Sequence, residues 1–173
     1  MATEAAFLVA EKKLGTADRR RERFTRIAEI AFMSDRKMMS TIEVDHERGD
    51  ERVVVPKGAP DVLLGLCTRT RVGTSTVPLD DALRRRILAD VATLTDAALR
   101  TLAVAYRPLA SHEDPQALGD RLELLERDLI FVGTVTKTES RWSDPQRRAI
   151  ETVVTFADLT WVRGRTQSGI ALR

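Results

Sequence analysis

The chain has 173 residues, of which 43% are hydrophobic, which suffices for one ordinary core and fits the usual size of a single domain. Its 28 basic and 26 acidic residues leave a net charge of only +2, so composition gives no reason to expect a nucleic-acid partner. The single cysteine, Cys67, excludes an internal disulfide, and there is neither an apolar run of about 20 residues nor a signal-peptide pattern, which predicts a soluble cytoplasmic chain.

The N-terminal part of the chain shows helical periodicity followed by strand-like patterns. Thr3 can cap a first helix that ends near Gly15, and the charged segment 18–24 predicts a second helix. Apolar residues then dominate or alternate with polar ones in three segments, which predicts strands over 27–32, 38–44 and 53–55.

The remainder continues as a mixture of helices and strands. Pro60 suits the first turn of a short helix through Leu66, and acidic residues at 80–81 open a longer helix. Two buried strands are predicted over 102–106 and 129–135, with a short helix over 118–125 between them. This order predicts an α+β fold, an antiparallel β-sheet with flanking helices.

Several common kinds of site have no motif in the sequence. Neither a Walker phosphate loop nor the glycine fingerprint of dinucleotide folds is present, and no nucleophile-elbow pattern surrounds a serine. His46 and His112 lie far apart in polar stretches without other ligands nearby, so no metal site is predicted. Cys67 is expected to be a small buried apolar residue.

The segment from Phe32 to Ser40 joins two predicted strands and places an aromatic ring five residues before Lys37. A purine base can stack on such a ring, which is worth about 1–3 kcal/mol, while a lysine supplies charge for phosphates. The pattern alone is more typical of a buried phenylalanine at a strand end beside solvated charges.

A second segment follows the strand predicted over 53–55. The strand delivers Lys57 to its end, and Gly58 and Ala59 leave room for a ligand to approach the backbone before Pro60 starts a helix. By itself this pattern predicts a turn, with Gly58 as a candidate ligand contact.

Together the two segments resemble the nucleotide-binding domain of P-type ATPases. The family pattern of Phe, Ser, Arg-Lys and Met-Ser is present at Phe32, Ser34, Arg36, Lys37, Met39 and Ser40, and its Lys-Gly-Ala-Pro-acid motif at residues 57–61. Further matches follow in the family's order: Thr3 and Glu4 before an apolar helix, the Leu-Arg strand at 99–106, and the exit strand at 126–133. The resemblance covers roughly residues 2 to 135, with spacing typical of bacterial calcium-pump-like members.

The resemblance implies a role for each matching residue. Phe32 would stack on adenine, and Glu4 would accept a hydrogen bond from the adenine amino group. Lys37 and Lys57 would line the pocket, and Arg100 would reach the phosphates with its planar guanidinium. The implied ligand is ATP, with magnesium as part of the ATP complex and not held by this chain.

Other parts of such pumps have no counterpart in the chain. In the family, phosphate passes from ATP to an aspartate in an Asp-Lys-Thr-Gly-Thr motif on a separate domain, and this motif is absent here. The resemblance therefore implies that the chain has no catalytic residue and positions ATP without turnover. The opening strands of the family's sheet are also expected to be missing, which would leave an edge exposed.

The C-terminal part departs from the family after the exit strand. The family's Asp-Pro-Pro-Arg is replaced by Asp-Pro-Gln-Arg at residues 144–147, a helix is possible over 145–154, and residues 155–173 show no clear period. We therefore expect an ATP-binding domain over 1–135, incomplete at its start, and a divergent tail over 136–173, partly helical or disordered.

The leading hypothesis is an ATP-binding domain fragment of a cation-transporting P-type ATPase. Its partners would be ATP and, where these exist in trans, the phosphorylation and membrane domains of a pump, at the cytoplasmic side of the cell membrane. The alternative is a relic or interaction module that has lost useful nucleotide binding. Nucleic-acid binding by the arginines of 19–23 and 84–86 is disfavoured, because no aromatic series accompanies them and 84–86 is expected to be a solvated helix face. Direct membrane insertion is not expected.

Overall fold

We analysed a computed structural model, which describes residues 17–96, 99–138 and 154–156. Its helices are α2 (Ala17–Arg23), α3 (Pro60–Leu66), α4 (Asp81–Asp96) and α5 (Pro115–Leu118), with 3-10 helices η1 (His46–Arg48) and η2 (Gly119–Leu125). Its strands are β1 (Phe24–Met33), β2 (Met38–Asp45), β3 (Glu51–Gly58), β4 (Cys67–Val72), β5 (Ser75–Pro78), β6 (Leu99–Pro108), β7 (Leu129–Thr138) and β8 (Val154–Phe156). Each helix and strand expected between residues 18 and 135 is present.

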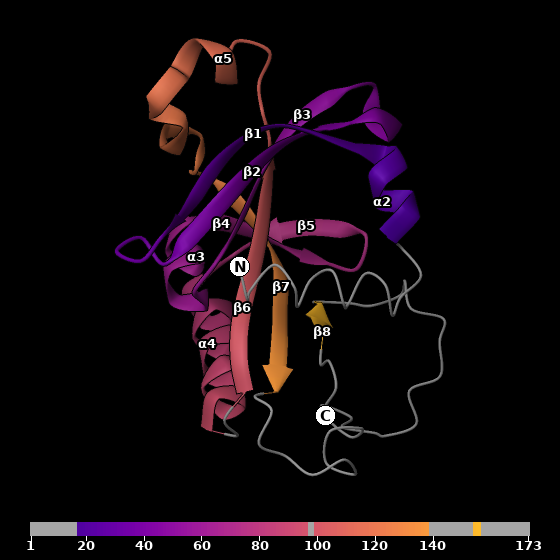
Figure 1. Ribbon diagram of the computed structural model, residues 1–173. Coiled ribbons are helices and arrows are strands. Elements are labelled where there is room, and N and C mark those ends of the chain that lie inside the picture. Colours follow the sequence, from indigo (N-terminus) through magenta and orange to yellow (C-terminus); the bar gives the residue numbers. More distant parts are fainter. Residues whose placement is uncertain (1–16, 97–98, 139–153, 157–173) are drawn as a thin grey trace.

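The strands form one sheet in the order β1-β2-β3-β6-β7-β4-β5, and β8 pairs with β7 beside this path. Neighbouring strands in the described part of the chain are antiparallel, as predicted, except that β4 and β7 run parallel from the pair Cys67 and Leu129. A parallel pair needs a long connection, here through β5, α4 and β6. Figure 1 shows α3 and α4 along one side of β6, so the predicted α+β class is confirmed.

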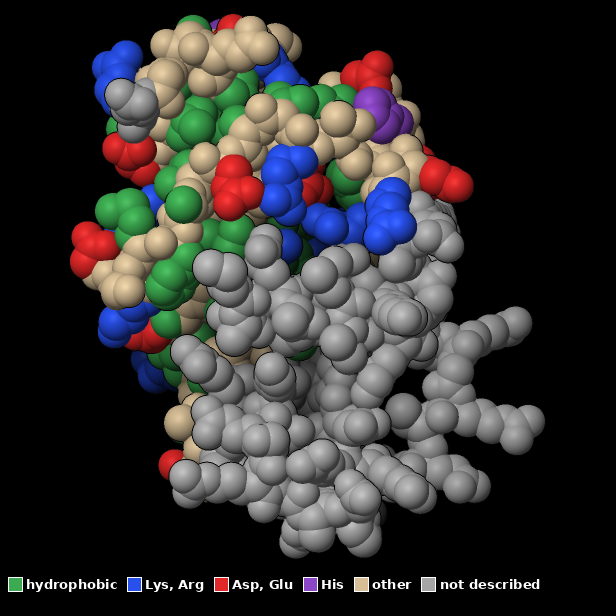
Figure 2. All heavy atoms as spheres, in the orientation of Figure 1, with side chains coloured by type: hydrophobic (Ala, Val, Ile, Leu, Met, Phe, Trp, Pro, Cys, Tyr) green, Lys and Arg blue, Asp and Glu red, His purple; other side chains and the backbone are tan. Residues whose placement is uncertain are grey.

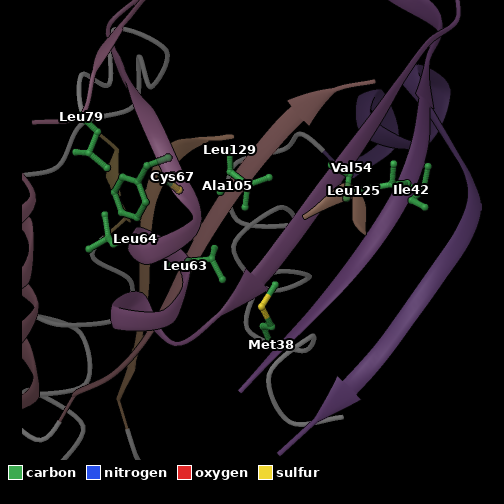
Figure 3. Packing of buried hydrophobic residues seen from close by; sticks show 12 residues of the cluster. Met38, Ile42, Val54, Leu63, Leu64, Cys67, Leu79, Ala105, Leu125 and Leu129 are labelled. Atoms are coloured by element: carbon green, nitrogen blue, oxygen red, sulfur yellow. The ribbon is translucent and has the colours of Figure 1, made fainter. Parts of the chain in front are cut away.

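The apolar core lies between the sheet and α3. Pro60 occupies the first turn of α3, where its fixed φ suits a helix start, and the helix directs Leu63 and Leu64 inward at 0% and 1% exposure. Figure 3 shows side chains from distant segments packing there, among them Met38 of β2 and Leu129 of β7. The full buried cluster consists of Met38, Ile42, Val54, Leu63, Leu64, Cys67, Leu79, Ala103, Ala105, Leu125, Leu129 and Phe131.

Cys67 belongs to this core, as the sequence predicted. It is 2% exposed, and burial raises the pKa of its thiol to about 12 because the thiolate would lose its hydration. The side chain is therefore a protonated, small apolar group with little reactivity.

Helix α4 covers the sheet only partly. None of its residues, all of which the structure describes, is fully buried, and Leu83 and Ile87 are half-buried against the core. The prediction for Arg84 is wrong: it donates hydrogen bonds to the carbonyl of Leu64 and, at 3.1 Å, to that of Cys67. Carbonyls at the end of a helix lack partners within it, so a neighbouring arginine is stabilising there. The next two arginines, at 85 and 86, are exposed as expected.

The hairpin of β4 and β5 was not predicted from the sequence. Its strands carry mainly threonine, arginine and serine, so they lack the alternation of apolar residues that indicates a half-buried strand. Thr70 is nevertheless 1% exposed and donates its hydroxyl to the carbonyl of Phe131 at 3.3 Å. The sequence signal for this hairpin was Gly73, which lies between two short runs that each contain threonine and valine. In the structure Gly73 forms the turn with a left-handed φ of 60°.

A buried ion pair fixes the segment that follows β6. Both terminal nitrogens of Arg107 donate to the carboxylate of Glu113, at 2.7 and 3.1 Å, and one also donates to the carbonyl of Leu125 at 2.9 Å. The Ala110 amide adds a bond to the same carboxylate at 2.9 Å. The hydrogen bonds from Arg107 are the main reason that the pKa of Glu113 falls to about 2, since they favour the ionised form.

Part of the C-terminal prediction lies outside the described residues, as does the helix expected to begin at Thr3. Residues Val154–Phe156 form β8, which pairs with residues 133–135 of β7, although a helix through residue 154 and an unpatterned tail beyond it were expected. The domain division at residue 135 stays a prediction. Within the ranges that the structure describes, no helix is long and apolar enough to cross a membrane.

Candidate functional site

The turn between β1 and β2 carries the first predicted motif. Met33 and Met38 pair at its base, and residues 34–37 connect them. Lys37 has a left-handed backbone with φ of 54°, which costs a non-glycine residue about 1–2 kcal/mol. Its amide donates to the carbonyl of Met33 at 2.8 Å, and its own carbonyl accepts from the amide of Ala59 at 3.0 Å. These bonds hold Lys37 in place and join the turn to the segment after β3.

Gly58 lies where the two predicted motifs meet. It pairs with Met38 on β2 and with Ala103 on β6. A Cβ atom at Gly58 would lie 2.5 Å from the Cβ of Met38 and 2.6 Å from the carbonyl oxygen of Lys37. The close approach of the β1–β2 turn therefore requires glycine here, independently of any ligand. A contact between Gly58 and a nucleotide stays a prediction.

Phe32 and Lys57 lie at the same end of β2, on the two strands that flank it, and the pairing of β1 with β2 is irregular between Ile30 and Met33. Phe32 precedes Met33 and Lys57 precedes Gly58, and both of those residues pair with Met38. At the usual spacing of strands, the two backbones are about 10 Å apart. Phe32 is 56% exposed, so its ring is open to a flat ligand, and Lys57 is half-buried. The register thus brings an aromatic ring and a lysine from the two motifs to one part of the sheet.

A buried polar network holds the base of the same turn. Glu126, 6% exposed, lies three residues before β7 and accepts the hydroxyl of Ser40 at 2.5 Å on one carboxylate oxygen. Its other oxygen accepts a hydrogen bond from the guanidinium of Arg36. This contact of Glu126 could not be predicted from the sequence, because Arg36 lies 90 positions away and no local spacing links the two.

Two predicted site residues are not tested by these contacts. Arg100 lies on β6, where its backbone pairs with Lys137, four residues before the Val104 that pairs with Lys57. The side chain of Arg100 is outside the described part of the chain, and so is the whole of Glu4. The structure therefore brings Phe32, Lys37, Lys57 and Gly58 together, while contacts of the other two with a ligand remain predictions.

Helix α2 is fastened to β2 by arginine–carboxylate pairs. Arg23 donates to both oxygens of Asp45 at 2.8 and 2.5 Å, and Arg20 donates to Glu43 at 3.0 Å. The hydrogen bond from Arg23 is the largest cause of a lowered pKa at Asp45. Because these arginines already face carboxylates, they do not form a uniform basic patch, and Figure 2 shows basic and acidic side chains intermixed on that face.

Comparisons with known proteins agree with the resemblance seen in the sequence. Residues 1–139 match the family model described as P-type ATPase, cytoplasmic domain N. The chain is 33% identical over 149 residues to calcium-transporting ATPase 1 of Lactococcus lactis and 36% identical over 132 residues to the calcium-transporting ATPase of Bacillus subtilis. It is also 34% identical over 113 residues to the P-type magnesium-transporting ATPase 1 of Escherichia coli.

These relatives are much longer than the chain. The alignments cover 86%, 76% and 65% of this chain but only 16%, 14% and 12% of the three relatives, in the same order. The matched range contains the β1–β2 turn, the segment around Lys57, and strands β6 and β7. The chain therefore belongs to the P-type ATPase family, as a cytoplasmic N domain.

Proposed function

We propose that this chain binds ATP as the N domain of a cation-transporting P-type ATPase and positions the nucleotide for phosphate transfer to an aspartate outside this chain. The observation that carries the proposal is the placement of exposed Phe32 and half-buried Lys57 at the same end of β2, on the two strands that flank it. The hydrogen bond from the amide of Ala59 to the carbonyl of Lys37 supports it, because it joins the two motifs directly.

The two kinds of side chain suit the two ends of ATP. The ring of Phe32 offers a stacking surface for adenine, a contact worth about 1–3 kcal/mol. The ammonium groups of Lys37 and Lys57 offset the charge of the phosphates. This electrostatic attraction is stronger where the lysine is partly shielded from water. Glu4 and Arg100 complete the proposal, as acceptor for the adenine amino group and as donor to the phosphates.

In this proposal the chain supplies binding and orientation, and the rest of the pump supplies the chemistry. The sequence lacks the Asp-Lys-Thr-Gly-Thr motif that takes up phosphate in the family, so holding ATP in a fixed geometry is the domain's contribution. Magnesium would arrive on the nucleotide. The relatives are named as calcium- and magnesium-transporting ATPases, and we extend cation transport at the cytoplasmic side of a membrane to the pump that contains this domain.

The test is a two-dimensional NMR titration of the chain with ATP and, separately, with guanosine triphosphate. Phe32→Ala and Lys57→Ala should each weaken ATP binding, the first by about 5- to 150-fold if stacking on the ring contributes its usual free energy. Ile27→Ala is the matched control, because Ile27 is a similarly exposed apolar residue of the same strand, at 46%. It should leave the affinity unchanged.

The outcomes separate the two main hypotheses. Shifts near Phe32 and Lys57 that disappear in both variants, but not in Ile27→Ala, support ATP binding at this site. A well-dispersed spectrum that does not respond to millimolar ATP contradicts the proposal and favours an interaction module that has lost nucleotide binding. A stronger response to guanosine triphosphate would contradict the choice of adenine.

A further inference from the structure

We infer that Glu126 is a positioning residue for the nucleotide site: it does not contact ATP, but it fixes the β1–β2 turn that presents Phe32 and Lys37. This inference rests on the ATP binding proposed above and adds a role for Glu126, which the resemblance included only as the first residue of the exit-strand match. Its basis is the pair of contacts that Glu126 makes, a partly buried one with Arg36 and a buried one with Ser40.

The contacts of Glu126 bracket the turn at two points. Arg36 immediately precedes Lys37 in the turn, whereas Ser40 lies on β2, where it pairs with Ile30 on one side and Pro56 on the other. Ser40 is fully buried, and Glu126 is 6% exposed. Both carboxylate oxygens are engaged, one by a charged donor and one by a hydroxyl, which fixes the orientation of the carboxylate as well as its position.

The turn depends on these contacts because apolar packing supplies little there. β1 is an edge strand, and Phe32 and Met33 are 56% and 45% exposed, so the core holds this end of the hairpin only on its β2 side, through Met38. Glu126 ties the tip to the segment before β7, a central strand of the sheet. Loss of the tie would leave Arg36 and Ser40 without this acceptor and would let the ring of Phe32 move relative to Lys57, and misplacement of about 1 Å is enough to weaken a preorganised site.

Glu113 provides a matched control within the same chain. Like Glu126 it is a buried glutamate, 9% exposed, whose carboxylate is paired with an arginine, but its partners Arg107, Ala110 and Arg127 are not residues of the β1–β2 turn. Because Arg127 directly follows Glu126, Glu113→Gln also controls for a general loosening of that segment. Glu126→Gln and Glu113→Gln change the same atoms and remove the same charge. Both should lower stability, whereas only Glu126→Gln should weaken ATP binding, by about tenfold if stacking on Phe32 is largely lost.

The experiment combines two measurements on the intact chain, with each variant held under conditions where it is folded. The first is ATP affinity by NMR titration for wild type, Glu126→Gln, Glu113→Gln and Ser40→Ala. The second needs no ligand: it is hydrogen exchange of the Lys37 amide, which is protected by its bond to the carbonyl of Met33. Ser40→Ala removes one contact without removing the charge, so it tests the tie even if Glu126→Gln does not fold.

The expected result is faster exchange at Lys37 and weaker ATP binding in Glu126→Gln and Ser40→Ala, with both quantities unchanged in Glu113→Gln. Unchanged exchange in the first two variants would overturn the inference, and so would faster exchange with unchanged affinity. Failure of the wild type to bind ATP is a distinct outcome: it overturns the proposed function, and with it the positioning role, even if the exchange data show that Glu126 holds the turn.

Discussion

The core around α3 and the turn between β1 and β2 are held by different forces. Leu63 and Leu129 are 0% exposed and pack among other apolar side chains, so their contribution comes from burial. The turn instead exposes Phe32 and depends on backbone bonds of Lys37 and on the carboxylate of Glu126. The core therefore contributes stability, while the proposed ligand contacts lie at the turn, so substitutions in the core should lower stability without changing ATP affinity.

The largest separation is expected at Leu63. Leu63→Ala removes a fully buried side chain and leaves a cavity, which should lower the free energy of unfolding by about 2–5 kcal/mol. ATP affinity should stay unchanged under conditions where the variant is folded. Urea unfolding measures the first quantity and NMR titration the second. Leu124→Ala is the control, because Leu124 is 51% exposed and its loss should cost less than about 0.5 kcal/mol.

Low pH should reveal how much a buried polar group contributes to stability. Glu113 is such a group, because it is buried like the core residues but ionised. Its folded-state pKa of about 2 lies below the ordinary value of 4.5, so its contribution is fully present above pH 4.5 and is lost as the pH falls toward 2. The expected loss is on the order of 3 kcal/mol. Unfolding curves measured from pH 6 to pH 2.5 should show it, and Glu113→Gln should have a flatter pH dependence. Identical slopes for both proteins would contradict the assignment.

A substitution at Gly58 tests the contact between the β1–β2 turn and the end of β3. Gly58→Ala puts a methyl group against the backbone of Lys37 and Met38, which cannot move as freely as a side-chain end, and should destabilise by about 1–3 kcal/mol. Gly65→Ala is the matched control: it lies in α3 with open space around it and should stabilise by up to about 1 kcal/mol. Thermal unfolding of both variants checks the pair. Equal effects would mean that the turn does not restrict Gly58.

The regular elements of the fold were predictable where apolar residues recur with a clear period. Residues 53–55 and 60–66 are examples, since a valine run and a proline-started helix leave few alternatives. The β4–β5 hairpin was not predicted because its buried residue Thr70 is polar and is accommodated by a hydrogen bond, so the strand shows no apolar pattern. The buried contacts of Arg84 were not predicted for a related reason. Its partners are carbonyls at the end of another helix, and only the packing of α4 on α3 brings them within reach.

The site was predictable only through the two motifs. Phe32 and Lys57 come to the same end of β2 because Met33 and Gly58 share a partner on that strand, a register that cannot be derived from either motif alone. Glu126 could not be found at all, because its link to Arg36 depends on the pairing of strands far apart in sequence. A single sequence shows local periodicity, but it does not determine which distant segments come into contact.

The parallel pairing of β4 with β7 has a consequence for how the domain folds. β1, β2 and β3 are joined by short turns and can pair soon after synthesis, as can β4 and β5. The middle of the sheet must wait for β7, which pairs with β6 along one edge and with β4 and then β8 along the other. Such distant pairings are slow to form, so a nascent chain that has not yet added β7 exposes unpaired strand edges and depends on rapid completion, or on a chaperone, to avoid aggregation.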